Sequence, residues 1–347
     1  MKTSDFDYHL PESSIAQTPA EPRDSSRLLV LHRDSGKLEH RIFRDVEDYL
    51  NSGDLLVLNQ TRVIPARIFA HKETGGHVEI LLLRRRDTLT WEALVGGKGL
   101  RVGKLVFVDV GEGNSQSVQA EIVELLDGPE RLIRFSEPIE PYFPNVGHVP
   151  LPPYIHEKLN DPERYQTVYA KEPGSAAAPT AGLHFTPRLL EELQVKGVKI
   201  AYVTLHVGLD TFAPVIEDDP ETHKIHTEWC ELSQETADLI KQTKQSSGRV
   251  VAVGTTSVRT LESAAQSLTA NSQPLIAPFT EPTSLFILPG YQFKIVDVMI
   301  TNFHLPKSTL LMLASAFAGR EKILETYETA VKEGYRFYSF GDAMLIL

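Results

Sequence analysis

The sequence predicts an α/β protein: a large α/β domain with a mostly parallel sheet or barrel-like core, plus an inserted small antiparallel β-barrel domain. Two observations predict this fold. Near-continuous apolar runs alternate with helical patterns in residues 187–333, which is typical of a parallel sheet covered by helices. Short alternating segments separated by Gly, Asp and Asn occupy residues 67–135, which is typical of a small antiparallel sheet or barrel. The expected domains are 1–66 and 150–347 for the large domain and 67–149 for the insertion.

The first expected strand is Asp54–Asn59, because four consecutive apolar residues indicate a strand buried on both faces. The insertion follows it, and the proline-rich connector Pro150–Tyr154 leads back to the large domain. The strands expected in the insertion are His77–Leu83, Leu89–Val95, Leu105–Val108, Val118–Leu126 and Arg131–Phe135.

The second half of the chain alternates strands and helices. The expected strands are Val198–Leu205, Arg249–Val253 and Phe293–Ile300, each a nearly unbroken apolar or β-branched run. The expected helices, which have apolar residues at helical spacing, are Pro187–Lys196, Gln234–Gln245, Ser257–Leu268, Thr309–Ala318 and Lys322–Glu333.

The composition is that of a folded globular protein, with 41% hydrophobic and 23% charged residues among 347. No apolar run approaches the length of a membrane-spanning helix, and the N-terminus has no secretion signal, so the expected location is the cytoplasm. The single cysteine, Cys230, excludes an internal disulfide and a multi-cysteine metal site.

The net charge of -11 argues against wholesale nonspecific binding to nucleic acid but leaves room for a local basic surface. Two basic stretches could form one. They either contact phosphate groups or are solvated hairpin tips that keep a strand edge from pairing. The residues concerned are Arg84, Arg85 and Arg86 in the first stretch, and Lys98, Arg101 and Lys104 in the second.

The segment Tyr165–Thr186 packs small residues, hydroxyls and aromatic residues around one histidine, His184. It has neither helical nor alternating periodicity and contains glycine and proline, which indicates an ordered loop. A solvent-exposed linker is the alternative, but such linkers avoid aromatic residues. A ligand-binding loop is therefore the favoured interpretation.

Polar residues follow four of the expected strands. In open α/β sheets, ligands bind beyond the carboxyl ends of strands, so these turns could converge on one pocket. They are Asn59–Arg62, His206–Gly208, Gly254–Ser257 and Thr301–His304. At Gly254–Arg259 a strand leads into three hydroxyl residues at a helix start, which suits an anion, although ordinary helix capping explains the same pattern.

Three other kinds of site find little support. His223 and His226 lie close together, but no acid or cysteine follows at metal-ligand spacing, so no metal is expected. Acids flank Cys230 and oppose a thiolate, which makes it a buried thiol rather than a nucleophile. Ser257 lacks the G-x-S-x-G motif of serine hydrolases.

Several long motifs occur in order along nearly the whole chain. They are Asp5–Tyr8 with Leu10–Glu12, Gly53–Arg67, Tyr165–Thr186, Val203–Gly208, Val253–Arg259, Thr301–Pro306 and Tyr335–Met344. With them the chain closely resembles the S-adenosylmethionine:tRNA ribosyltransferase-isomerases of queuosine biosynthesis. Residues 83–145, within the inferred insertion, contribute little to the resemblance.

The resemblance implies transfer and isomerisation of the ribosyl part of S-adenosylmethionine onto 7-aminomethyl-7-deazaguanine at the tRNA wobble position. The products would be epoxyqueuosine-tRNA, adenine and methionine. S-adenosylmethionine is then a consumed substrate, no cofactor or metal is implied, and the partners are tRNA and S-adenosylmethionine, with no membrane. The expected state is a monomer.

This chemistry needs a base for the C5′ proton beside the sulfonium, a donor to the departing adenine and a dry pocket. His184 and His206 are the candidate catalytic residues, with base and acid roles left open between them. The candidate substrate-binding residues are Asn59, Thr61, Arg62, Tyr165, Tyr169, Thr180, Phe185, Thr255, Thr256, Ser257, Arg259, Asn302, His304 and Asp342. The two basic stretches become the candidate tRNA-binding residues.

Two other functions are consistent with parts of the sequence. An S-adenosylmethionine-dependent methyltransferase would share the α/β sheet, but Asp54–Arg62 has no glycine-rich turn after its strand. A noncatalytic RNA-binding module should be more basic and needs no histidine in a tight loop. The reaction products distinguish the three functions, because only ribosyl transfer releases adenine and methionine.

Overall fold

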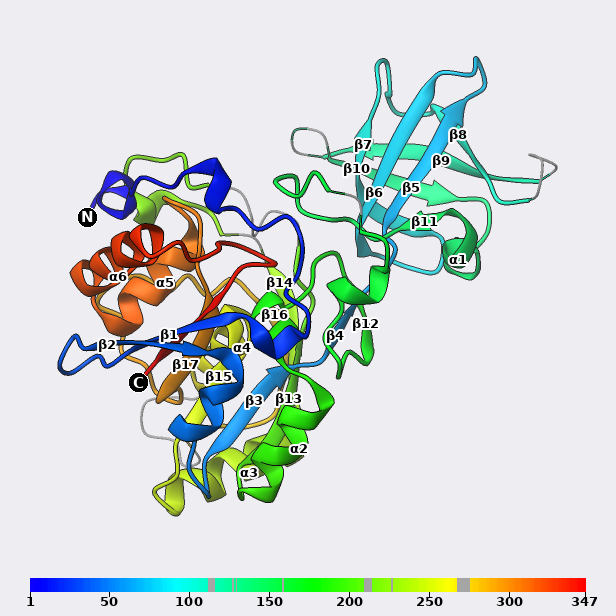
Figure 1. Ribbon diagram of the computed structural model, residues 1–347. Coiled ribbons are helices and arrows are strands. Elements are labelled where there is room, and N and C mark those ends of the chain that lie inside the picture. The colour runs from blue at the N-terminus through cyan, green and yellow to red at the C-terminus, as the bar shows by residue number, and fades with distance from the viewer. Residues whose placement is uncertain are drawn as a thin grey trace. The chain divides into compact units, whose positions relative to one another are not determined.

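The computed structural model describes residues 1–111, 116–126, 128, 130–157, 159–208, 214–225, 227–266 and 275–347 (Figure 1). The chain divides into two compact units. The sheet unit contains residues 1–62, 153–172 and 178–347, and the barrel unit contains residues 63–152 and 173–177. The segment 173–177, part of the expected ligand-binding loop, thus belongs to the barrel unit.

The sheet unit is built on a sheet with nine described strands. In spatial order they are β16 (Phe279–Thr283), β14 (Glu228–Leu232), β13 (Lys199–Leu205), β3 (Leu55–Asn59), β15 (Val250–Val253), β17 (Val298–Asn302), β18 (Ala343–Ile346), β1 (Arg27–Leu31) and β2 (Leu38–Ile42). The four strands from β13 to β17 are parallel to one another, as is β1 to β18. The other neighbours are antiparallel.

The expectation of a mostly parallel sheet or a barrel-like core is therefore wrong in this detail, since the sheet is mixed and β16 and β2 stand at its edges. One reason lies between β17 and β18, where two helices follow each other, α5 (Thr309–Ala318) and α6 (Arg320–Lys332). A single crossover helix returns the chain to start a parallel strand, whereas a pair of helices brings it back at the opposite end. Strand β18 consequently runs antiparallel to β17.

The remaining helices of this unit are α2 (Pro187–Val195), α3 (Gln234–Gln245) and α4 (Gly254–Gln266). Helices α3 and α5 begin and end at the expected residues, where Ser233 and Ser308 cap their first turns. The last strand differs, because β17 covers Val298–Asn302 rather than Phe293–Ile300. Residues 293–297 are irregular backbone that a buried carboxylate on α4 holds in place.

Apolar residues on both faces of the sheet form two cores. In β3, Leu56 and Leu58 pack on one face with Phe185 and with Leu189 and other residues of α2. Leu55 and Val57 point to the opposite face, where residues of α3, α4, α5 and α6 pack. Alternation of side chains along a strand produces this division, and the doubly covered strand explains its unbroken apolar run.

The barrel unit is a closed antiparallel barrel, as expected for the insertion in outline. Its described strands are β5 (Arg67–Lys72), β6 (His77–Arg85), β7 (Thr90–Gly96), β10 (Glu130–Phe135), β9 (Ser117–Leu125) and β8 (Leu105–Asp109), in that spatial order. Pairing of β5 with β8 closes the ring, and β11 (Gly147–His148) adds to β5. A short helix, α1 (Phe143–Val146), precedes β11.

Short elements complete the described chain. Strands β4 (Thr61–Val63) and β12 (Glu172–Ser175) form a two-stranded sheet. Short 3-10 helices occur at Thr3–Phe6, Glu12–Ser14, Arg23–Ser25, Phe43–Tyr49, Glu140–Tyr142, Pro162–Tyr165, Thr180–His184 and Pro220–Thr222. None of the described helices is both long enough and apolar enough to cross a membrane.

Candidate active site

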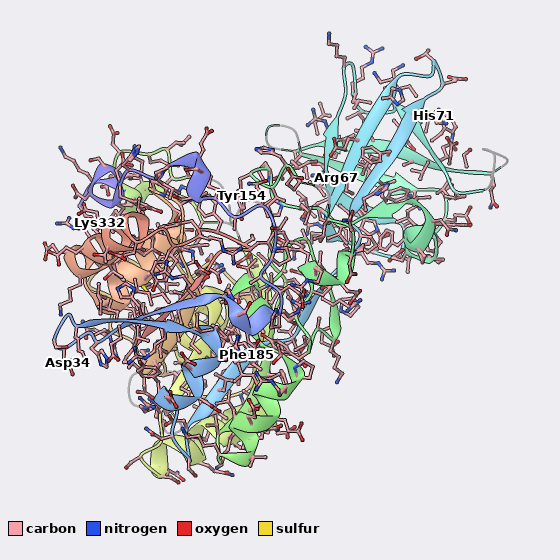
Figure 2. The ribbon with its side chains drawn as sticks, viewed as in Figure 1. Asp34, Arg67, His71, Tyr154, Phe185 and Lys332 are labelled. Atoms are coloured by element: carbon pink, nitrogen blue, oxygen red, sulfur yellow. The ribbon has the colours of Figure 1, made fainter. Side chains whose placement is uncertain are left out.

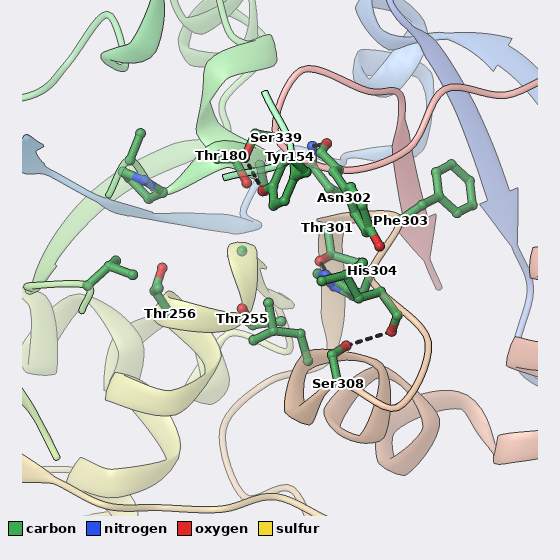
Figure 3. A pocket seen from close by; sticks show the side chains of 18 residues that line it. Tyr154, Thr180, Thr255, Thr256, Thr301, Asn302, Phe303, His304, Ser308 and Ser339 are labelled. Carbon is green, nitrogen blue, oxygen red and sulfur yellow. Dashed lines mark hydrogen bonds between the residues drawn. The ribbon is translucent and has the colours of Figure 1, made fainter. Parts of the chain in front are cut away.

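A cavity in the sheet unit lies where β15 and β17 end (Figure 3). The turns after these strands line it together with the start of the 3-10 segment Thr180–His184. The lining residues are Tyr154, Ala178, Pro179, Thr180, Ala181, Val207, Gly254, Thr255, Thr256, Thr301, Asn302, Phe303, His304, Leu305, Ser308, Leu310, Tyr338 and Ser339. The space between them is about 630 Å³, including the part open to solvent.

Gly254 turns the chain from β15 directly into α4. Its φ of +83° lies in the left-handed region that favours glycine. The turn brings Thr255 and Thr256, at the first turn of the helix, to the cavity wall. In Figure 3 both threonines rise from the end of this helix toward the space opposite His304.

Three polar atoms of the cavity lining are buried and have no hydrogen-bond partner among the described residues. They are Oγ1 of Thr256, Oδ1 of Asn302 and the hydroxyl of Tyr338. Buried polar groups in folded proteins are nearly always paired, and an unpaired one costs about 1 to 3 kcal/mol. Their convergence on one cavity indicates a polar ligand that supplies the missing partners.

The same lining contains a strained backbone position. Tyr338 is not glycine, yet its φ is +69°. Its carbonyl accepts a hydrogen bond of 2.9 Å from Nδ2 of Asn302, which fixes both residues at the cavity. Its ring lies 4.6 Å from that of Tyr154, whose hydroxyl is 2.8 Å from Oγ of Ser339. Such strain at a cavity wall is typical of functional sites.

His304 starts the turn after β17, and its Nε2 lies 2.8 Å from Oγ1 of Thr301. Its backbone N–H donates to the Tyr327 hydroxyl, and its carbonyl accepts from Tyr8. Burial lowers the pKa of His304 to about 3. The imidazole is therefore neutral at pH 7 and can accept a proton or hydrogen bond.

His184 lies outside the cavity lining. Its Nδ1 is 2.7 Å from Oγ of Ser26, and its ring stacks on Phe43 with centroids 4.9 Å apart. Burial, together with the positive charge of Arg336, lowers the pKa of His184 to about 3, while Asn302 opposes the shift. The Nε2 of His184 is buried and has no partner of regular hydrogen-bond geometry. Asn302, which lines the cavity, raises the pKa of His184, so His184 lies next to the cavity wall.

His206 occupies a different environment. Its Nδ1 lies 2.7 Å from Oγ1 of Thr61, and its ring stacks on Trp229 with centroids 5.3 Å apart. Burial lowers the pKa of His206, and the charge of Glu172 partly restores it. His206 does not line the cavity, although its neighbour Val207 does.

The aromatic residues of the predicted loop are packed into the core. Tyr165 and Phe185 are fully buried, and Phe185 meets Phe43 edge to face with centroids 5.0 Å apart. Tyr169 lies against Gly182, where an added Cβ would clash with the tyrosine hydroxyl. Their packing holds the loop that carries Thr180, which does line the cavity.

Other predicted substrate-binding residues hold the backbone together. The amide of Asn59 exchanges hydrogen bonds of 3.0 and 3.1 Å with the backbone of Leu205, which ties the ends of β3 and β13. Asp342 accepts from the N–H groups of Arg27 and Arg336 at 2.9 and 2.8 Å. Ser257 donates to the carbonyl of Val253. Arg62 forms an ion pair of 2.5 Å with Glu163.

Arg259 does not lie on a wet helix face. It forms a buried ion pair with Glu228 of β14, and its Nε donates to the carbonyl of Leu285 at 3.1 Å. Cys230 lies beside this pair and is fully buried, and burial raises the pKa of its thiol to about 12. The cysteine is thus a neutral thiol, and the arginine already has an anionic partner.

The first predicted basic stretch lies on the barrel unit. Arg84 and Arg85 belong to β6, and Arg86 follows it. Arg85 pairs with Glu140 at 2.9 Å, and Arg86 pairs with Glu92. These ion pairs reduce the positive charge that this stretch offers to a phosphate.

The second basic stretch joins β7 to β8. Lys98, Arg101 and Lys104 have no ion pair with an acid among the described residues. This stretch therefore presents more free positive charge than the arginine run.

No group of three His, Cys, Asp or Glu side chains that could hold a metal ion occurs in the described part of the chain. His223 pairs with Glu217 at 2.8 Å, and His226 lies outside the described residues.

Comparison with known proteins bears on the whole chain. A family model described as queuosine biosynthesis protein matches residues 3–346. The chain belongs to this family. A relative from Carboxydothermus hydrogenoformans is 55% identical over 351 residues, and one from Acetivibrio thermocellus is 53% identical over 351 residues, each with 100% of both chains covered. Both are named S-adenosylmethionine:tRNA ribosyltransferase-isomerase.

A solved structure of the queuosine biosynthesis family is also similar. It is the crystal structure of an S-adenosylmethionine tRNA ribosyltransferase from Thermotoga maritima, 40% identical to this chain, with a TM-score of 0.57. The match covers 99% of this chain and 100% of the other. The resemblance expected from the motifs is thereby confirmed.

In this member of the family, five predicted substrate-binding residues line the cavity. They are Thr180, Thr255, Thr256, Asn302 and His304. Sequence reasoning missed Tyr154, Tyr338 and Ser339, although the last two fall in a recognised motif. A tyrosine after a proline-rich connector and a serine in an aromatic run give no chemical signal by themselves.

Proposed function

We propose that this chain is an S-adenosylmethionine:tRNA ribosyltransferase-isomerase. It transfers and isomerises the ribosyl part of S-adenosylmethionine onto 7-aminomethyl-7-deazaguanine at the tRNA wobble position, releasing adenine and methionine. The observation that carries this conclusion is the family match over residues 3–346, with relatives of that name aligned over their full length.

The cavity between the ends of β15 and β17 is the proposed site for S-adenosylmethionine. Thr256 and Asn302 offer unpaired polar atoms for the ribose hydroxyls or the adenine edge. The rings of Tyr154 and Tyr338 are placed to stabilise the positive sulfonium, because aromatic faces attract cations. These contacts are stronger in a pocket from which water is excluded.

The reaction needs proton transfer at two points, the C5′ carbon and the departing adenine. Two buried histidines and one half-buried histidine surround or line the site. His304 lies in the cavity wall, His184 behind Asn302, and the half-buried His206 beside Val207. The lowered pKa values keep His184 and His304 neutral at pH 7, so neither is an imidazolium acid in the free protein, and a ligand that raises the pKa would strengthen either one as a base. His184 and His206 remain the proposed proton carriers, with His304 as a third group in contact with the substrate.

The barrel is proposed as an inserted tRNA-binding domain in the α/β domain that carries the chemistry. S-adenosylmethionine is proposed as a consumed substrate, with no metal or other cofactor. The proposed enzyme is a cytoplasmic monomer, and light scattering of the purified chain measures its mass.

Product analysis tests the reaction. The chain is incubated with S-adenosylmethionine and tRNA that carries the aminomethyl-deazaguanine, and the small molecules are separated. Adenine and methionine should appear in equal amounts with one modified tRNA for each. S-adenosylhomocysteine would instead identify a methyltransferase, and binding without turnover would identify an RNA-binding module.

The cavity is tested with Asn302→Leu, which removes both polar atoms and keeps a similar volume. The variant should raise the KM for S-adenosylmethionine or lower kcat by about 10-fold or more. Leu324→Met on α6 serves as a control far from the lining. Normal kinetics in a folded Asn302→Leu would remove this cavity from the reaction.

A further inference from the structure

Four aromatic and imidazole rings form a row on the outside of the barrel unit. They are His148 of β11, Phe69 and His71 of β5, and Phe107 of β8. The ring centroids of Phe69 and His148 are 5.1 Å apart, and those of His71 and Phe107 are 5.7 Å apart and nearly parallel. We call these four residues the ring row.

Strand geometry places the row on one surface. Residues 69 and 71 point outward because the alternate residues Ile68 and Ala70 fill the barrel interior. In the strand pairing, His71 lies opposite Phe107 and His148 lies opposite Arg67. Arg67 and Phe69 are two residues apart on β5 and therefore point to the same side. Figure 2 labels Arg67 and His71 on this strand.

The row does not contribute to the barrel core. Phe69 is 56% exposed, the largest exposed fraction of any aromatic side chain in the described residues. His148 beside it is also exposed, and His71 and Phe107 are half-buried. A single exposed apolar residue needs no explanation, but adjoining rings that reach the surface form a patch of the kind that marks a binding surface. The flat faces available there are suited to stacking.

Free positive charges lie at one end of the row. Lys72 follows His71 on β5, and its ammonium donates to the carbonyl of Lys98. The N–H of Lys104 donates to the carbonyl of Arg101, and Lys104 directly precedes β8. We call Lys72, Lys98, Arg101 and Lys104 the basic turn, and none of them forms an ion pair with an acid among the described residues.

Two acids beside the row already have partners. Asp109 pairs with His71 at 3.1 Å, and Glu79 pairs with Arg67 at 3.1 Å. The pairing with Asp109 and a contact of 3.0 Å with the carbonyl of Lys72 hold the imidazole of His71 in one orientation. The surface thus combines oriented rings with unneutralised cations.

We propose that the ring row and the basic turn bind the single-stranded loop nucleotides of the tRNA substrate. Unstacked bases lie against Phe69 and the neighbouring rings, and phosphates contact the lysines and arginine of the basic turn. RNA is the partner because stacking platforms beside backbone-tracking cations are the common solution for single-stranded nucleic acid. This inference rests on the proposed function, since that function supplies tRNA as the partner.

The test measures tRNA affinity of the full chain at several salt concentrations. Phe69→Ala should weaken binding by about 10-fold through loss of stacking, with an unchanged salt dependence. Phe69→Trp, which keeps an aromatic ring at this position, should bind tRNA as tightly as the unaltered chain. Lys98→Ala combined with Lys104→Ala should weaken binding and lower the slope of log affinity against log salt by roughly 0.7 to 0.9 per lost phosphate contact.

Matched controls are available elsewhere on the surface. Val195→Ala removes a side chain that is 84% exposed on α2, and Lys332→Ala removes an exposed cation at the end of α6. Both should leave tRNA affinity unchanged, and every variant should bind S-adenosylmethionine normally. If Phe69→Ala weakens the affinity for loop RNA and for a fully paired RNA duplex by the same factor, the ring row does not bind by stacking on unpaired bases.

Failure of this inference can be told apart from failure of the proposed function. If the unaltered chain releases no adenine, the function is wrong, whatever the variants bind. If the unaltered chain turns over but Phe69→Ala and the double lysine variant keep its KM for tRNA, the function stands and the ring row is not the tRNA surface. A protein partner would then be the better occupant of this face.

Discussion

Polar residues next to the cavity differ in whether the protein itself satisfies them. Asn59 and Asn302 are the last residues of two buried strands, yet the carbonyl oxygen of Asn59 accepts two backbone N–H groups, whereas that of Asn302 has no partner of regular hydrogen-bond geometry. The sequence shows the same pattern in both places, a polar residue after an apolar run. Only the hydrogen-bond partners in the folded chain distinguish a side chain that holds the backbone from one that is available to a ligand.

Arg259 illustrates the same limit with a charge. The sequence predicts an anion contact at a helix start, but the partner is Glu228, which is distant in sequence and buried in β14. No local signal connects these residues. A buried ion pair that loses one partner leaves an uncompensated charge, which costs far more than a surface contact.

We therefore expect Arg259→Ala to act on stability. It should lower the free energy of unfolding by about 3 to 5 kcal/mol, and the double variant with Glu228→Gln should recover part of the loss. Denaturant unfolding measures both. A stable Arg259→Ala protein with weakened binding of S-adenosylmethionine or tRNA would instead restore the anion-site interpretation.

The buried histidines make stability depend on pH. The pKa values of His184 and His304 are about 3 in the folded chain and about 6.5 in the unfolded chain. Between these values the unfolded state binds more protons, so stability should fall as pH decreases below about 6.5. The slope is about 1.4 kcal/mol per pH unit for each histidine.

His304→Gln tests this dependence, because glutamine does not titrate. Its stability should fall less steeply between pH 6.5 and 4 than that of the unaltered chain, in urea unfolding at each pH. His77→Gln, on the exposed start of β6, is the control and should leave the slope unchanged. Parallel curves for all three proteins would exclude His304 as a titrating group in this range.

At the scale of elements, helix caps and two-sided strands were the most predictable features. Ser233 and Ser308 start α3 and α5 where expected, and the unbroken apolar run of β3 lies at the centre of the sheet. Strands β1, β2, β5 and β18 were not predicted. Strands β14 and β16 were also missed, because β14 contains two acids and β16 contains Pro282. Their partners lie far away in sequence, and local pattern cannot reveal them.

The segment before β17 shows why an apolar run can mislead. Residues 293–296 are apolar except Lys294, but the N–H groups of residues 294–296 bond to a side chain instead of a neighbouring strand. The acceptor is the carboxylate of Glu262, fully buried on α4. A long-range contact thus replaces the ladder that the sequence pattern favours.

Glu262→Gln should consequently destabilise the protein. The glutamine amide turns an N–H donor toward the backbone N–H groups and removes the negative charge. The free energy of unfolding should fall by about 2 to 3 kcal/mol. Thermal unfolding measures it, with Glu328→Gln on the exposed face of α6 as a control that changes stability by less than about 0.5 kcal/mol. Equal stability of the two variants would show that Glu262 does not hold this segment.

At the scale of the whole molecule, the change in hydrophobic pattern along the sequence predicted two architectures in one chain. Alternating short segments became the closed barrel, and alternating strands and helices became the large sheet. The mixed direction of that sheet was not predicted, since direction depends on how the chain returns after α6 and no residue pattern records it.

Each unit has its own core, so each should respond to damage in that core. Ile122→Ala in β9 should lower the unfolding temperature of the barrel unit, and Leu56→Ala in β3 should lower that of the sheet unit. Each substitution should reduce the free energy of unfolding of its unit by about 2 to 5 kcal/mol. Calorimetry should resolve which transition moves. If either substitution shifts the whole profile as one transition, the two units unfold cooperatively.

The position of β18 has a consequence for synthesis on the ribosome. Strand β1 ends at Leu31, but the neighbour that connects it to the rest of the sheet is formed by Ala343–Ile346. Translation therefore delivers the hairpin of β1 and β2 first and its docking strand last. Until β18 is synthesised, β1 presents an open edge that could pair with another nascent chain, and β17 does the same once residue 302 has been added. Ribosomes stalled before residue 343 should yield chains that need chaperones to stay unaggregated.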